Sequence, residues 1–122
     1  MTARVLLFLG ALNAALTVVA GAYGAHVVKN PAYATLFQTA MQYHVFHALG
    51  LLVIGVVAVL RPSATLLAWA GALMLLGILL FCGSLYVHAF TGYRGLSIVT
   101  PFGGTAFILA WLLLATAVLR FP

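Results

Sequence analysis

Four long apolar runs, separated by short polar connectors, make up almost all of this 122-residue chain. Each run has about 20 residues, enough for an α-helix to cross the ~30 Å hydrocarbon core of a bilayer. The chain is 66% hydrophobic and 4% charged, whereas about a quarter of the residues of a soluble domain are charged. Because lipid cannot satisfy free backbone polar groups, such runs must be helical. We therefore predict an all-α integral membrane four-helix bundle with short loops, in which residues 1–122 form a single domain.

Capping and breaking residues set the bounds of the four predicted helices. The helices are expected at about 4–28, 31–60, 64–90 and 101–120. Asn30-Pro31 and Thr100-Pro101 are favourable starts, because a polar cap precedes a proline at the first helical position. Ser63 is expected to cap the third helix, and Gly92 can end it in a left-handed conformation. Four spans place both termini on the same side of the membrane.

The chain carries five basic residues and no aspartate or glutamate. Arg4, Arg61 and Arg120 lie on the side of the termini, and Lys29 and Arg94 lie on the other. The excess of positive charge in cytoplasmic segments slightly favours cytoplasmic termini. Because the cations are scattered, we expect them to anchor the chain at the interface and to contact anionic lipid headgroups. Nucleic-acid binding is not expected, since no basic cluster is present.

Small residues are arranged for close helix packing. Along the first span they recur every three or four positions, at Gly10, Ala14, Thr17, Gly21 and Gly24. That spacing forms one stripe, and small stripes let helices approach closely in lipid. Asn13 lies beside the stripe and is expected to bond to a neighbouring helix. Gly103 and Gly104, at the start of the fourth span, predict another close contact or, alternatively, a cradle for an anion on free amides.

All four histidines fall in the half of the membrane that Lys29 and Arg94 border. His44 and His47 are three residues apart, and this spacing places them near one helix face, where both could bind one metal ion with His26 or His88 as a third ligand. Imidazole suits zinc or copper, and a haem held by two histidines is also chemically possible. The simpler alternative is that the histidines bond to backbone carbonyls, tyrosines or interfacial water.

The absence of carboxylates argues against several classes of protein. A glutamate-based metalloprotease, a paired-carboxylate hydrolase and a proton-coupled exporter with a membrane carboxylate all need a residue type that this chain lacks. Cys82 beside a histidine could act as a nucleophile, but its neighbours are typical of a helix-packing contact. An enzyme is therefore the least favoured class.

Four motifs in this order resemble a known family. They are Gly21-Ala22-Tyr23-Gly24-Ala25-His26, the stretch from Phe37-Gln38-Thr39-Ala40 to His47-Ala48-Leu49, Leu80-Phe81-Cys82-Gly83-Ser84-Leu85-Tyr86, and Thr100-Pro101-Phe102-Gly103-Gly104. Nearly the whole chain resembles the YgdD-like family of small bacterial inner-membrane proteins of unknown function, which has eukaryotic relatives. The resemblance implies a multi-pass, four-helix protein of the bacterial inner (cytoplasmic) membrane. His26 and His47 fall on its motif positions, whereas His44 and His88 do not.

Two hypotheses for function follow. The first is a binding or accessory protein with a polar pocket near one membrane face, for a small ligand, a metal ion or a lipid headgroup. Its predicted contacts are His26, His47, Tyr23, Tyr43 and Ser84. The second is a structural subunit that docks through small-residue helix faces onto a second copy of itself or a larger membrane complex.

Overall fold

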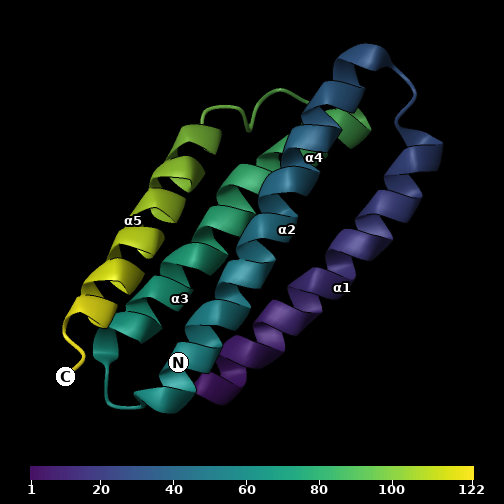
Figure 1. Ribbon diagram of the computed structural model, residues 1–122. Coiled ribbons are helices and arrows are strands. Elements are labelled where there is room, and N and C mark those ends of the chain that lie inside the picture. Colours follow the sequence, from purple (N-terminus) through teal and green to yellow (C-terminus); the bar gives the residue numbers. More distant parts are fainter.

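The computed structural model describes residues 1–122 and is entirely helical. Its elements are α1 (Ala3–Val27), α2 (Pro31–Leu60), α3 (Thr65–Gly77), the π-helical η1 (Ile78–Cys82), α4 (Gly83–Thr91) and α5 (Thr100–Leu119). The elements α3, η1 and α4 follow one another without a break as a single span, so four helices are long and apolar enough to cross a membrane. Both termini lie at the same end (Figure 1). The predicted all-α membrane bundle is confirmed.

The helix ends follow from local capping, with two differences from expectation. Asn30 caps α2 by accepting a hydrogen bond of 3.0 Å from the amide of Ala32, and Gly92 ends α4 with φ 77°. Ser63 is the predicted cap of the third span, but the N-cap residue is Ala64, whose side chain makes no capping hydrogen bond. The hydroxyl of Thr100 likewise does not cap α5, because it bonds to the hydroxyl of Ser84.

The spans lie in the order α1, α2, third span, α5 across the molecule (Figure 1). The most extensive packing joins α1 to α2 and α3 to α5, and the third span also packs on α2. By contrast, α2 and α5 have hardly any backbone contact. The bundle is therefore not a closed square, and a space remains between α2 and α5.

The glycine stripe of α1 lies against α2. A Cβ atom added to Gly24 would lie 2.2 Å from Cζ of Phe37, and one added to Gly10 would lie 2.9 Å from Cδ2 of Leu52. Gly21 leaves a wider gap, with Cε of Met41 at 3.2 Å from an added Cβ. Both contacts below 3 Å fall on side chains of α2, so α2 already covers this stripe within the bundle.

A second close contact holds α5 against η1. A Cβ atom added to Gly103 would lie 2.3 Å from the backbone nitrogen of Phe81. At this level the third span forms a π turn, in which the amide of Gly83 bonds to the carbonyl of Ile78. Such turns are rare inside α-helices and often occur near functional sites. The sequence did not predict it.

The adjacent glycines of α5 provide a matched test of this packing. Gly103→Ala is expected to lower the free energy of unfolding by about 1–3 kcal/mol, because the backbone of Phe81 would have to move. Gly104→Ala should change it by less than about 1 kcal/mol, since the nearest atom to an added Cβ is 3.8 Å away. Unfolding of both variants in mixed detergent micelles would measure the difference. Equal stabilities would contradict the close contact.

Candidate ligand-binding site

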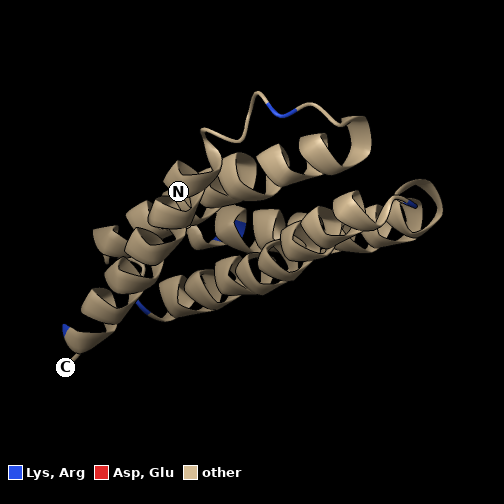
Figure 2. Ribbon diagram, turned by 90° about the horizontal axis from the view of Figure 1, so that it is seen from above, with Lys and Arg blue, Asp and Glu red and all other residues tan.

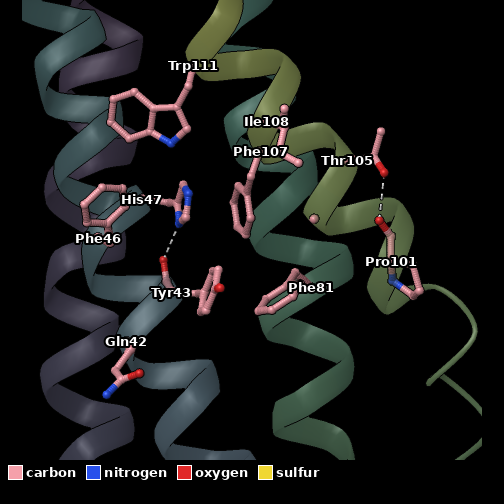
Figure 3. Close-up of a pocket in the computed structure, with 11 residues that line it drawn as sticks. Gln42, Tyr43, Phe46, His47, Phe81, Pro101, Thr105, Phe107, Ile108 and Trp111 are labelled. Atoms are coloured by element: carbon pink, nitrogen blue, oxygen red, sulfur yellow. Dashed lines mark hydrogen bonds between the residues drawn. The ribbon is translucent and has the colours of Figure 1, made fainter.

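A cavity of about 660 Å³ occupies the space between α2 and α5. Its lining comes from three elements (Figure 3). They are Gln42, Tyr43, Phe46 and His47 of α2, Phe81 of η1, and Pro101, Gly104, Thr105, Phe107, Ile108 and Trp111 of α5. The spacing of three and four residues along α2 and along most of the α5 set brings these side chains to one face of each helix. The cavity therefore lies between the facing sides of α2 and α5, and Phe81 of the third span closes it on one side.

The cavity runs inward from one membrane face. Pro101 lies in the first turn of α5, and Trp111 follows ten residues later, about 15 Å further along the helix. That distance is about half of the hydrocarbon thickness. Figure 3 shows Gln42 and Tyr43 at one end of the cavity and His47 and Trp111 at the other. Counted along α5 from its first turn, the first end lies near the membrane face and the second near the middle of the membrane.

His47 is a polar residue at the inner end, and only 4% of its surface is exposed. Its Nδ1 lies 2.6 Å from the backbone oxygen of Tyr43. Because a carbonyl oxygen can only accept, Nδ1 carries the hydrogen, and Nε2 of the neutral ring is an acceptor. Nε2 makes no hydrogen bond within the protein. Every fully buried side-chain nitrogen and oxygen of the protein has a hydrogen-bond partner, so Nε2 is not one of the fully buried atoms. Nε2 is therefore accessible from the cavity.

Aromatic side chains fix the orientation of this imidazole. Phe107 stacks on the His47 ring with centroids 3.5 Å apart and an interplanar angle of 11°. The indole nitrogen of Trp111 is turned toward His47 (Figure 3), and the two ring centroids are 6.0 Å apart. The indole N–H can only donate, and it makes no hydrogen bond within the protein. The inner end of the cavity therefore presents an acceptor and a donor to the same space.

His44 has different surroundings from His47. Asn13 donates from Nδ2 to the carbonyl of Leu9 at 2.8 Å, and this bond turns Oδ1 toward His44, 3.0 Å from Nε2. Nε2 must then be the donor, so Nδ1 accepts from the hydroxyl of Tyr86 at 2.9 Å. Both ring nitrogens are satisfied, and the bonds join α1, α2 and α4. The expected bond from Asn13 to a neighbouring helix is confirmed.

The predicted binding residues do not all meet. Tyr43 and His47 line the cavity. His26 is exposed at the end of α1, and Tyr23, which is 58% exposed, packs beside Phe90 with ring centroids 5.4 Å apart. Ser84 is buried and donates to the carbonyl of Phe81. The structure thus divides the predicted set between the cavity, the end of α1 and the junction of α4 with α5.

The proposed metal ligands His26, His44 and His47 do not come together either. No group of three or more histidine, cysteine or acidic residues could hold a metal ion. The side chains of residues three apart on a helix differ by about 60° in direction. Here that difference is enough to turn the two histidines toward different neighbouring helices. His44 faces α1 and α4, whereas His47 faces α5. A haem held by His44 and His47 does not fit, because both nitrogens of His44 are already bonded.

Sequence reasoning missed the aromatic walls of the cavity, chiefly Phe81, Phe107 and Trp111. The spacing of Phe107 and Trp111, four residues apart and following the glycine pair, was an available signal. An aromatic residue in a membrane span more often faces lipid, so the spacing alone did not show whether Phe107 and Trp111 line a cavity or face lipid.

Comparison with known proteins identifies the family. The profile described as "Protein of unknown function (DUF423)" matches residues 20–104. The chain is 42% identical over 121 residues to a UPF0382 membrane protein of Staphylococcus epidermidis, covering 97% of this chain and 98% of the relative. This chain belongs to the DUF423/UPF0382 family. It is also 40% identical to the UPF0382 membrane protein YwdK of Bacillus subtilis, over 97% of this chain and 98% of the relative.

The DUF423/UPF0382 relatives also support the membrane assignment. The UPF0382 inner membrane protein YgdD of Escherichia coli is 35% identical over 123 residues, covering 98% of this chain and 93% of the relative. The family that the sequence motifs resemble is thereby confirmed. No solved structure matches the chain.

The bond between His44 and Tyr86 can be tested by removing one hydroxyl. Tyr86→Phe leaves Nδ1 of His44 without a donor, and we expect the free energy of unfolding in detergent to fall by about 0.5–2 kcal/mol. Tyr23→Phe is the control, because Tyr23 is exposed and its substitution should lower the free energy of unfolding very little. A Tyr86→Phe variant as stable as this control would show that the bond contributes nothing.

Proposed function

We propose that this DUF423/UPF0382 protein is a binding protein, which takes up a small membrane-soluble molecule in the cavity between α2 and α5. The observation that carries the proposal is His47, an almost fully buried imidazole whose Nε2 has no partner in the protein. This nitrogen is open to the cavity and accepts no hydrogen bond from the protein. A ligand with a hydrogen-bond donor could bond to it there.

The size and position of the cavity support this proposal. Its volume of about 660 Å³ falls within the roughly 300–1,000 Å³ typical of small-molecule sites. Because α2 and α5 hardly touch, the cavity is bordered by the lipid-facing side chains of Phe46 and Ile108, which are 59% and 62% exposed. A molecule dissolved in the bilayer could therefore enter sideways, without first passing through water.

The alternative role as a docking subunit has less support. In that hypothesis the small-residue stripe of α1 binds a second copy or a larger complex. However, Gly10 and Gly24 lie against Leu52 and Phe37 of α2, so the stripe is not free for another partner. Docking would have to use a different face of the bundle.

The cavity can be closed by one substitution. In a Trp69→Phe background, Trp111 is the single tryptophan and lies in the cavity wall. We expect 4-bromoanisole, a small apolar quencher, to reduce its fluorescence saturably in detergent. Gly104→Leu should abolish the saturable part, because its side chain would extend into the cavity.

Ala115→Leu, at an exposed position of α5 outside the cavity, is the matched control and should leave the quenching unchanged. Quenching that never saturates, or that is the same in both leucine variants, would contradict a binding cavity.

We also propose that both termini are cytoplasmic and that the basic residues contact anionic headgroups. Figure 2 shows the lysine and arginine positions, with no acidic residue anywhere in the chain. The side of the termini carries three of the five basic residues, Arg4, Arg61 and Arg120, which the positive-inside rule favours for the cytoplasm.

Reporter fusions test this orientation. Alkaline phosphatase fused after Pro122 should be inactive, and phosphatase fused after Gly95, in the connector on the opposite face, should be active, because the enzyme folds only outside the cytoplasm. Green fluorescent protein after Pro122 should fluoresce. Active phosphatase at Pro122 would reverse the orientation.

A further inference from the structure

We infer that the molecule bound in the cavity is a neutral aromatic alcohol of the phenol or hydroquinone class, whose hydroxyl group donates to Nε2 of His47 and accepts from the indole N–H of Trp111. This inference rests on the proposed function, because it specifies the occupant of that cavity. Three features of the lining lead to it, namely its charge, its hydrogen-bonding groups and its rings.

The lining carries no formal charge. None of its residues is a lysine, arginine, aspartate or glutamate, and the inner end lies near the middle of the hydrocarbon. An anion or a cation there would lose its hydration without gaining a counter-ion, which is strongly unfavourable. Carboxylates, phosphates and ammonium groups therefore do not suit the inner end, and the ligand is neutral.

The hydrogen-bonding groups at the inner end require a ligand that both donates and accepts. The bond from Nδ1 of His47 to the carbonyl of Tyr43 makes Nε2 an acceptor, so the ligand must supply a hydrogen. The indole N–H of Trp111 requires an acceptor. A hydroxyl group is the smallest neutral group that does both. A ketone, ester or ether satisfies Trp111 but leaves Nε2 without a partner.

The rings around the cavity favour an aromatic ligand over an aliphatic alcohol. Tyr43 and Phe81 lie with ring centroids 4.4 Å apart, and Phe107 lies 5.7 Å from Phe81. Offset stacking and edge-to-face contacts between rings add about 0.5–1.5 kcal/mol beyond the burial of area. An alkyl chain gains only the free energy of burying its apolar area. The ligand therefore has its hydroxyl group on an aromatic ring.

Three brominated probes separate these features in the Trp69→Phe protein. They are 4-bromophenol, 4-bromoanisole and 6-bromohexan-1-ol, each of which quenches Trp111 on binding. We expect 4-bromophenol to bind at least about tenfold more tightly than the other two, because only it combines the hydroxyl with the ring. The three probes partition differently into detergent, so each Kd is expressed in terms of the probe concentration within the micelles. That concentration is obtained from the partitioning of each probe into micelles without protein.

His47→Phe should reduce the preference for the phenol over the anisole to about one, while both probes still quench saturably. His47→Gln offers an amide oxygen as an acceptor and should restore part of the preference. His26→Phe is the matched control, since His26 is exposed and outside the cavity, and it should leave the preference unchanged.

The possible failures have different meanings. Equal affinity for the phenol and the anisole, or a preference that survives His47→Phe, would overturn the hydroxyl assignment and leave the binding cavity intact. Bromohexanol binding as tightly as bromophenol would overturn the aromatic assignment. Quenching that does not saturate with any of the three probes would overturn the proposed function itself.

Discussion

The packing of α5 on the third span, which is close where Gly103 meets the backbone of Phe81, determines where α5 lies. Lipid is as apolar as the helices, so helices associate in a bilayer through close packing and hydrogen bonds. A glycine at this point lets α5 approach the third span at its π turn, and α5 makes hardly any contact with α2. The space between α2 and α5 is a consequence, and the aromatic side chains around it form the candidate site.

Two histidines one turn apart on α2 illustrate how neighbours decide the role of a polar group in a membrane. His44 has both ring nitrogens bonded, to Asn13 of α1 and Tyr86 of α4, and so joins three helices. His47 has one nitrogen bonded to its own helix, and the other is open to the cavity. The first histidine stabilises the bundle. The second is available to a ligand.

Of the residues that line the candidate site, the sequence predicted Tyr43 and His47. The predicted contacts His26, Tyr23, Tyr43, His47 and Ser84 share one half of the membrane, and His26 and His47 also fall on family motifs. Depth follows from helix bounds, which are local, whereas the direction of each side chain depends on how the helix is rotated against its neighbours. Rotation brings Tyr43 and His47 to the cavity and leaves His26 exposed. Trp111 was missed for the same reason.

The sequence by itself determined the four spans, the ends of the helices to within a residue, and the placement of both termini on one side. These properties are local, because a chain in lipid must satisfy each backbone group within its own helix. Tertiary structure decided which histidine nitrogen is free and where the cavity lies. His44 is satisfied by partners 31 and 42 residues away, and the cavity exists because α5 packs on the third span and not on α2. Only the packing of distant helices could establish either fact.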